Sequence, residues 1–211
     1  EATQTYAYAW ENLESTDNDA NPYTYFFTEE VVPGYTRTYS SSQMFDGTEY
    51  GVDGSTVTNE YVIPTDGKAE ATKKFVNGSP DTHIAPTMTL WRQLSDGTLE
   101  KVEATAVITG TAPTFYYSWT GLERTDSNGY EYEFYFTEDN VPVNYELTYT
   151  STLEKDGKLY GYNGAIAENK YKSPSREVTA YKQWVNGSAT DYYAVPLKLW
   201  RTTNPGVGPV E

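Results

Sequence analysis

The sequence predicts an all-β protein made of β-sandwiches with short strands. Tyrosine is unusually frequent, with 21 residues in the chain, and aromatic side chains favour strands. No stretch of useful length has the 3.6-residue period of an amphipathic helix. Glycine-containing turn pairs instead recur between the apolar runs, as expected for strands joined by tight turns. They are Asp46-Gly47, Asp53-Gly54, Asp66-Gly67, Asn77-Gly78, Asp96-Gly97, Asn128-Gly129, Asp156-Gly157 and Asn186-Gly187.

A repeat of about 109 residues divides the chain. The segment YTYFFTEEVVPGY, which begins at Tyr23, matches YEFYFTEDNVPVNY, which begins at Tyr132. The segment ATKKFVNGS, which begins at Ala71, matches AYKQWVNGS, which begins at Ala180. The repeat predicts one complete domain over residues 64–172. Residues 1–63 correspond to the later part of such a domain, and residues 173–211 correspond to its earlier part.

Strand alternation places three kinds of polar side chain on apolar faces, once in each copy of the repeat. Each inward face contains one lysine, one glutamate or one asparagine. On the strand that ends at Glu138, the opposite, outward face carries Glu131, Glu133, Tyr135 and Thr137. The inward sets are Tyr25, Phe27 and Glu29; Val57, Asn59 and Tyr61; Ala71, Lys73 and Phe75; Tyr132, Phe134, Phe136 and Glu138; Ala165, Ala167, Asn169 and Tyr171; Val178, Ala180, Lys182 and Trp184.

Two interpretations of these polar residues compete. Taken singly, each is an ordinary strand residue, because a lone inward lysine usually extends its amine to water and isolated buried charges are rare. Taken together, a lysine, a glutamate and an asparagine face inward at matched positions in both copies. Burying a lysine and a glutamate costs several kcal/mol unless they are paired or neutralised. An amide bond between lysine and asparagine would remove the lysine charge, so a covalent cross-link is the leading hypothesis.

The ordered motifs resemble those of the Cna B-type domains of Gram-positive surface proteins and pilins, which are reverse Ig-like β-sandwiches. The segment from Tyr25 to Tyr35 is close to Y-x-V-x-E-x-x-V-P-x-G-Y, although the second copy has Val143-Asn144 where one glycine is usual. The other matches are to T-K-x-W (Thr72 to Phe75, Tyr181 to Trp184), L-x-R (Leu90 to Arg92, Leu199 to Arg201), x-x-L (Trp10 to Leu13, Trp119 to Leu122) and T-N-x-Y (Thr58 to Tyr61, Glu168 to Tyr171).

The resemblance implies an intramolecular lysine–asparagine isopeptide bond with a glutamate as its catalyst. In the complete repeat these residues are Lys73, Asn169 and Glu138, and in the divided repeat they are Lys182, Asn59 and Glu29. Burial disfavours the charged forms of an amine and a carboxyl, so both can be neutral. A neutral amine can then attack the carboxamide while the carboxyl moves protons. Each site would react once, so the chain is not expected to be an enzyme with turnover.

Composition narrows the remaining functions. The net charge of −15 argues against binding to nucleic acid and suits a soluble, self-repelling surface protein. There is no cysteine to form disulfides, and no apolar run is long enough to insert into a membrane. Since Glu1 does not begin a signal peptide, we expect a mature, processed or excised chain. We expect no cofactor and no metal; the Asp17 to Asn21 loop lacks the glycine and the final glutamate of a calcium loop.

The leading hypothesis for function is a structural stalk or fibre module of a cell-wall-attached adhesin or pilus, outside the cell. The alternative is a binding module of an adhesin, in which loops or tyrosine-rich faces recognise a host protein or glycan. An enzyme is disfavoured, since the sequence has no Ser-His-Asp set, metal cluster or phosphate loop. The same three kinds of inward residue occur in both copies of the repeat. This favours the structural role, because a binding site would usually appear in only one copy.

The order of the pieces predicts that the chain's partners are neighbouring copies of itself. Residues 1–63 hold Glu29 and Asn59 without the lysine, and residues 173–211 hold Lys182 without the other two. The two parts are expected to join either between periods of a longer array or between separate chains in a head-to-tail fibre. Closure within one chain is disfavoured, because a short linker spans only about 35 Å.

Overall fold

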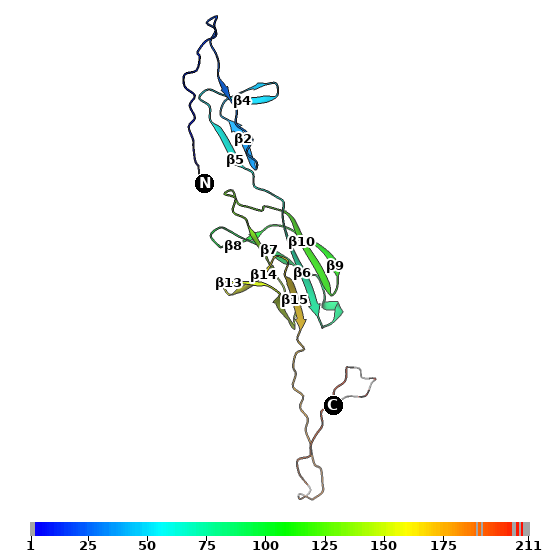
Figure 1. Ribbon diagram of the computed structural model, residues 1–211. Helices are drawn as coiled ribbons and strands as arrows, with labels where there is room; N and C mark the ends of the chain where they lie inside the picture. Colours follow the sequence, from blue (N-terminus) through cyan, green and yellow to red (C-terminus); the bar gives the residue numbers. More distant parts are fainter. Residues whose placement is uncertain (1–2, 189, 191, 204–205, 207, 209–211) are drawn as a thin grey trace. The chain divides into compact units, whose positions relative to one another are not determined.

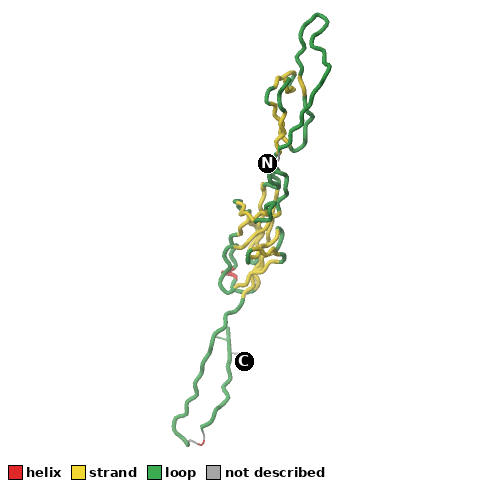
Figure 2. The backbone as a smooth tube through the Cα atoms, turned by 90° about the vertical axis from the view of Figure 1, so that its left-hand side faces the viewer, coloured by secondary structure: helices red, strands yellow, loops and turns green. Residues whose placement is uncertain are grey.

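The computed structural model describes residues 3–188, 190, 192–203, 206 and 208. Contacts divide the chain into two units, one ending at Ser173 and the other beginning at Pro174. The first unit contains all of the named strands, and Figure 2 shows loop conformation through most of the second. The chain is all-β, as predicted, and the 3₁₀ turn Pro80–Thr82 lies between two of its strands.

Residues 67–171 form a two-layer sandwich, which we call the central domain (Figure 1). One five-stranded sheet has the order β12-β15-β6-β10-β9, and the other has the order β13-β14-β11-β7-β8. The strands are β6 (Gly67–Val76), β7 (Met88–Gln93), β8 (Leu99–Val102), β9 (Val107–Thr111), β10 (Thr114–Leu122), β11 (Glu133–Glu138), β12 (Tyr145–Tyr149), β13 (Thr152–Lys155), β14 (Lys158–Tyr162) and β15 (Ile166–Tyr171).

The first and last strands of the central domain lie side by side. β15 pairs with β6 in parallel, with Ala167 opposite Lys73 and Asn169 opposite Phe75. On its other edge β6 pairs antiparallel with β10 over almost its full length. The strand by which the chain enters the central domain and the strand by which it leaves are therefore neighbours in one sheet.

The core lies between the two sheets and follows the expected alternation. In β6 every second residue is buried, from Gly67 through Ala69, Ala71 and Lys73 to Phe75. Trp119 and Tyr117 of β10 are also buried and stack with ring centroids 6.2 Å apart. Lys73 falls on the buried parity of a strand whose outward positions are mostly exposed, as the sequence predicted.

The outer face of the second sheet differs from the simplest expectation. Tyr135 and Thr137 occupy outward positions of β11, yet both are buried. The Tyr135 ring packs 4.9 Å from that of Tyr162, and Thr137 accepts a hydrogen bond from the indole of Trp91. Side chains of neighbouring strands thus cover these positions, which alternation along a single strand does not reveal.

Residues 26–61 reproduce half of the central domain's sandwich, and we call this part the N-terminal half-domain. Its sheets have the orders β1-β4-β3 and β2-β5, which match β11-β14-β13 and β12-β15. The strands are β1 (Phe26–Phe27), β2 (Tyr35–Tyr39), β3 (Ser42–Phe45), β4 (Thr48–Val52) and β5 (Val57–Tyr61). Among the described residues no strand pairs with the outer edge of β5 or of β1.

Two segments expected to be strands are loops in this structure. Residues 6–13 and 178–185 carry strand-like patterns, but neither contains a named strand. Their side chains are largely exposed: Trp10 and Tyr181 are 64% and 92% accessible. A strand is stabilised by hydrogen bonds to a neighbour, and none of the named strands of the described residues pairs with either segment. No helix among the described residues is long and apolar enough to cross a membrane.

Candidate functional site

Three polar side chains meet in the interior of the central domain. Lys73 lies in the middle of β6, Glu138 is the last residue of β11, and Asn169 lies in β15. The Lys73 amine is 2.9 Å from Glu138 Oε2, and both side chains are fully buried. Asn169 Nδ2 donates to Glu138 Oε1 at 2.7 Å. The predicted triad is therefore brought together in space, with the glutamate between the amine and the carboxamide.

The surroundings of the Lys73 amine act in opposite directions on its pKa. The amine lies 4.8 Å from the centre of the Phe75 ring and donates to the backbone oxygen of Ala167 at 3.3 Å. Burial lowers the pKa of the Lys73 amine from its ordinary value, and Glu138 opposes part of that shift. A lower pKa increases the neutral fraction of the amine, and only a neutral amine is nucleophilic.

Tyrosines surround the glutamate. The hydroxyl of Tyr149 accepts a hydrogen bond from the Glu138 backbone N–H at 3.1 Å, and burial raises the pKa of Tyr149. Burial also raises the pKa of Tyr117 to about 12, and its hydroxyl donates to the Pro86 carbonyl at 2.6 Å. Both phenols therefore stay neutral at ordinary pH and add no charge to the site.

Two buried oxygens of the triad accept no hydrogen bond among the described residues: Glu138 Oε2, which is paired with the Lys73 amine, and Asn169 Oδ1. Asn169 Oδ1 is buried, and no group in the described part of the chain donates to it. A buried acceptor without a donor costs about 1–3 kcal/mol. A hydrogen-bond donor at this oxygen is also what activation of the carboxamide carbon would require.

The N-terminal half-domain builds the same arrangement without the lysine. Asn59 Nδ2 donates to Glu29 Oε1 at 2.9 Å, and the Glu29 backbone N–H donates to the Tyr39 hydroxyl at 3.1 Å. Glu29 Oε2 and Asn59 Oδ1 are buried and have no hydrogen-bond partner among the described residues. We call Glu29 and Asn59 the open pair. It matches Glu138 and Asn169 and lacks an amine.

Lys182, the lysine expected to complete that set, is exposed in this structure, contrary to its predicted inward position. Its amine donates to the neighbouring carbonyl of Gln183 at 2.9 Å and lies 4.0 Å from the centre of the Trp184 ring. Its segment is not in a strand, so it has no inner face on which to place the side chain.

Sequence reasoning missed several residues that support the glutamates. Tyr39 and Tyr149 hold the backbone of Glu29 and Glu138, and the repeat spacing could have identified them. Gly51 and Gly161 were also missed. A Cβ on Gly161 would lie 2.7 Å from Phe136 Cζ and 2.9 Å from Tyr149 Cδ1, and a Cβ on Gly51 would lie 2.7 Å from Phe27 Cζ. These glycines leave room for the aromatic rings beside each glutamate.

The described residues contain no group of three or more His, Cys, Asp and Glu side chains placed to hold a metal ion. In the Asp17 to Asn21 loop, the Asp17 carboxylate accepts hydrogen bonds from the backbone of Asp19 and from Asn21. These bonds lower the pKa of Asp17. The loop satisfies its own carboxylate, as expected of a solvated turn.

Comparison with known proteins supports the resemblance drawn from the motifs. The model of the Cna protein B-type domain matches residues 1–60 and 69–161, which together make up most of the chain. No curated protein and no solved structure matches the chain. The family match covers Glu29, Asn59, Lys73 and Glu138, and it ends before Asn169 and Lys182. On the extent of this match, the chain belongs to the Cna protein B-type domain family.

Proposed function

We propose that this chain is a structural stalk or fibre module of a Gram-positive surface adhesin or pilus, stiffened by an isopeptide bond between Lys73 and Asn169. The family is typical of structural modules in cell-surface proteins. The observation that carries the proposal is the fully buried contact between the Lys73 amine and Glu138, with Asn169 bonded to the same carboxyl.

The chemistry follows from this contact. The neutral Lys73 amine attacks Cγ of Asn169, so that a new C–N bond forms and the bond from Cγ to Nδ2 breaks. Glu138 takes a proton from the attacking nitrogen and delivers one to the departing nitrogen, which leaves as ammonia. The product is a neutral amide, so the buried lysine charge is removed. No cofactor or oxidant is needed.

The position of the bond suits a stalk. It would connect β6 to β15, the first and last strands of the central domain, which already pair in parallel. The loop closed by the bond holds roughly 100 residues, and the chain-entropy estimate for such a cross-link is about 4–5 kcal/mol. Without cysteine, the chain would obtain by this route the stabilisation that other secreted domains obtain from disulfides.

Intact mass under denaturing conditions tests the proposal. It is best measured on the Lys182→Ala chain, in which the central triad is intact and the second lysine is absent. We expect the mass to be lower than the sequence mass by one ammonia, and peptide mapping to link Lys73 with Asn169. Glu138→Ala in that background should give a folded chain with the full sequence mass. Asp139→Asn, beside it, should still lose ammonia.

The result that would overturn the proposal is the full sequence mass in the Lys182→Ala chain, together with a Lys73 amine that reacts with acylating reagents after unfolding. Lys74 provides the matched control for the reagent. It is adjacent in sequence, and its side chain is half exposed and paired with Glu168, so it should be modified in every variant.

A further inference from the structure

The open pair of the N-terminal half-domain is arranged for an amine that this part of the chain does not supply. Glu29 and Asn59 are oriented by the same contacts as Glu138 and Asn169. The two atoms left without a partner are Glu29 Oε2, which corresponds to the oxygen that faces Lys73 in the central domain, and Asn59 Oδ1. A lysine placed as Lys73 is placed would complete the set.

The edges of the half-domain show where that lysine must come from. In the central domain β15 lies between β12 and β6, and β6 carries Lys73. In the half-domain β5 pairs with β2, and its other edge has no partner strand among the described residues. The missing neighbour is therefore a strand parallel to β5 that corresponds to β6.

The segment 178–185 has the inward pattern of β6. Val178, Ala180, Lys182 and Trp184 stand where β6 has Ala69, Ala71, Lys73 and Phe75. All four of those β6 residues are buried, whereas Val178 and Trp184 are 55% and 38% accessible in this structure. Burying their apolar surface in a sheet would be favourable.

Cross-strand pairs change together between the two copies. Lys74 of β6 lies opposite Glu168 of β15 and forms an ion pair with it at 3.4 Å. The corresponding residues in the other copy are Gln183 and Thr58, both neutral. A charged pair is thus replaced by an uncharged pair across the expected contact between 178–185 and β5, which leaves no unpaired charge.

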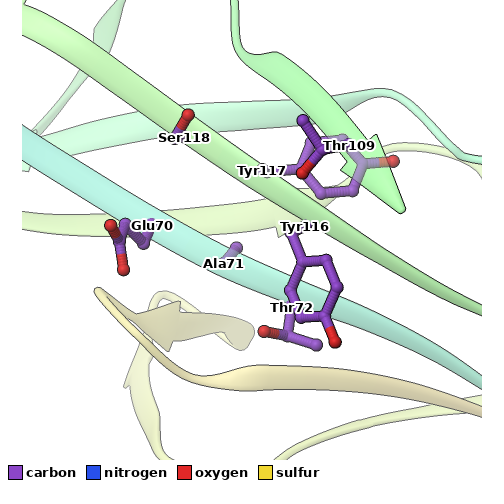
Figure 3. A pocket seen from close by; sticks show the side chains of 7 residues that line it. All are labelled: Glu70, Ala71, Thr72, Thr109, Tyr116, Tyr117 and Ser118. Atoms are coloured by element: carbon purple, nitrogen blue, oxygen red, sulfur yellow. The ribbon is translucent and has the colours of Figure 1, made fainter.

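A second pair, on the outer face, changes size in the same coordinated way. Figure 3 shows Tyr116 of β10 beside Thr72 of β6, which are partners in the sheet register. The corresponding residues are Ala7 and Tyr181. One copy has the large side chain on the β10 side and the other has it on the β6 side, so each pair contains one tyrosine and one small residue. This exchange is expected if segment 178–185 packs against the segment around Ala7.

The following segment fits the other sheet. Leu90 and Trp91 of β7 lie opposite Phe136 and Tyr135 of β11. By the repeat spacing, Leu199 and Trp200 correspond to Leu90 and Trp91, and Phe27 and Phe26 of β1 correspond to Phe136 and Tyr135. Leu199 and Trp200 are 67% and 48% accessible here, whereas Leu90 is 2% accessible.

We propose that residues 178–202 of a second copy of this chain complete the N-terminal half-domain, and that Lys182 of that copy forms an isopeptide bond with Asn59. Segment 178–185 adds in parallel to β5, with Lys182 opposite Val57 and Trp184 opposite Asn59, as Lys73 and Phe75 lie opposite Ala167 and Asn169. The Lys182 amine attacks Cγ of Asn59, the C–N bond forms, and ammonia leaves with protons transferred through Glu29. This step rests on the chemistry proposed for the central triad.

Chain connection favours a second copy over closure within one chain. Because β15 runs parallel to β6, the chain leaves Tyr171 at the opposite end of β6 from Gly67, which follows the half-domain. β6 has ten residues and spans about 33 Å. The residues between Tyr171 and Val178 reach at most about 24 Å. They cannot return along the length of β6 to the end at which the half-domain is attached.

Complementary variants of the full chain test the proposal. Lys182→Ala keeps the open pair and lacks the lysine, while Asn59→Ala keeps the lysine and lacks the acceptor. We expect the unaltered chain to give a ladder of multiples of the chain mass after boiling in detergent. Each variant alone should run as a monomer. Mixing the two should give one covalent dimer and no higher species, with peptide mapping linking Lys182 to residue 59. Lys172→Ala, a change at another exposed lysine, should leave the ladder intact.

Other outcomes overturn the proposal. A mixture that stays monomeric, or associates only until detergent is added, would rule out the bond between copies. A monomer of unaltered sequence with a Lys182–Asn59 link would instead show closure within one chain. Asn169→Ala separates failure of the link between copies from failure of the central cross-link. In the Lys182→Ala chain it should abolish the ammonia loss. In the otherwise unaltered chain it should leave the ladder in place.

Discussion

The central domain and the N-terminal half-domain contain the same glutamate–asparagine contact in very different states of burial. The hydrogen bonds differ little, with lengths of 2.7 Å and 2.9 Å. Burial differs greatly: Trp119 is 1% accessible, whereas its counterpart Trp10 is 64% accessible. Local strand pairing and a tyrosine hydroxyl are therefore enough to orient the carboxyl and the carboxamide. This tryptophan is buried in the central domain, which has the lysine-bearing strand, and exposed in the half-domain, which lacks it.

The largest difference between the two parts should follow from loss of the central cross-link. Lys73→Ala removes the proposed bond between the first and last strands of the central domain, so we expect a loss of about 4–5 kcal/mol from chain entropy alone. Lys182→Ala should leave the melting temperature of the central domain unchanged. Thermal unfolding followed by near-ultraviolet circular dichroism measures both. Equal melting curves for the two variants would contradict the unequal roles assigned to the two lysines.

Filling the space beside each glutamate should have the next largest effect. Gly161→Ala places a Cβ against Phe136 and Tyr149, and overpacking of this kind costs about 1–3 kcal/mol. It should destabilise the central domain and slow formation of its bond. Gly51→Ala should slow only the linkage between chains. Mass measurement gives the rate of bond formation in the central domain, and gel densitometry gives the rate of linkage between chains. Together the two rates would show whether the aromatic rings position the carboxyl groups. Unchanged rates in both variants would remove that role.

The pH dependence of stability should report the buried amine. In an Asn169→Ala chain, Lys73 keeps its free amine, and burial lowers its folded-state pKa below the ordinary value of 10.5. Between these two pKa values the unfolded chain binds more protons than the folded chain. Stability should therefore rise with pH across that window, by at most about 1.4 kcal/mol per pH unit. Tyr117, whose pKa is raised from 10.0 to about 12, has the opposite effect, which begins only at about pH 9, where the unfolded tyrosine starts to ionise.

Urea unfolding of the Asn169→Ala chain at several pH values measures this slope. Adding Lys73→Met provides the reference, because it removes the titrating amine and keeps an apolar side chain of similar length. The slope should disappear in the double variant. An identical slope with and without Lys73 would assign the effect to other groups.

The smallest effect is expected at a position that distinguishes the two copies. Arg37 lies opposite Asn59 in β2, where the central domain has Leu147 opposite Asn169. The Arg37 guanidinium donates to the Glu29 backbone carbonyl. An incoming strand that covers the open pair would also have to desolvate this charged guanidinium, which is unfavourable. Arg37→Leu should speed linkage between chains by a few-fold, as seen in the time course of the ladder, and slower linkage would indicate that Arg37 helps to hold the open pair.

Much of the fold and of the central triad could be predicted from the sequence, because both depend on alternation and repeat spacing. The inward parity of Lys73 and Asn169 is confirmed by their complete burial. Alternation along one strand does not specify its neighbours, so the burial of Tyr135 on an outer face was not foreseen. The same limit applies to Lys182, whose pattern is that of an inner strand face although its segment is a loop here. An alternating pattern predicts which face of a strand a side chain would occupy. It does not predict whether a partner strand is present to form that strand.

The parallel pairing of β6 with β15 has a consequence for extensibility. Without a cross-link, the roughly 100 residues between Lys73 and Asn169 would add about 340 Å of contour length when the central domain is pulled open. With the proposed bond in place, that length is inaccessible, and tension passes from β6 to β15 through a single amide. Elastic compliance would then reside in the short connections at residues 62–66 and 172–177. A series of such modules would behave as a chain of nearly fixed length.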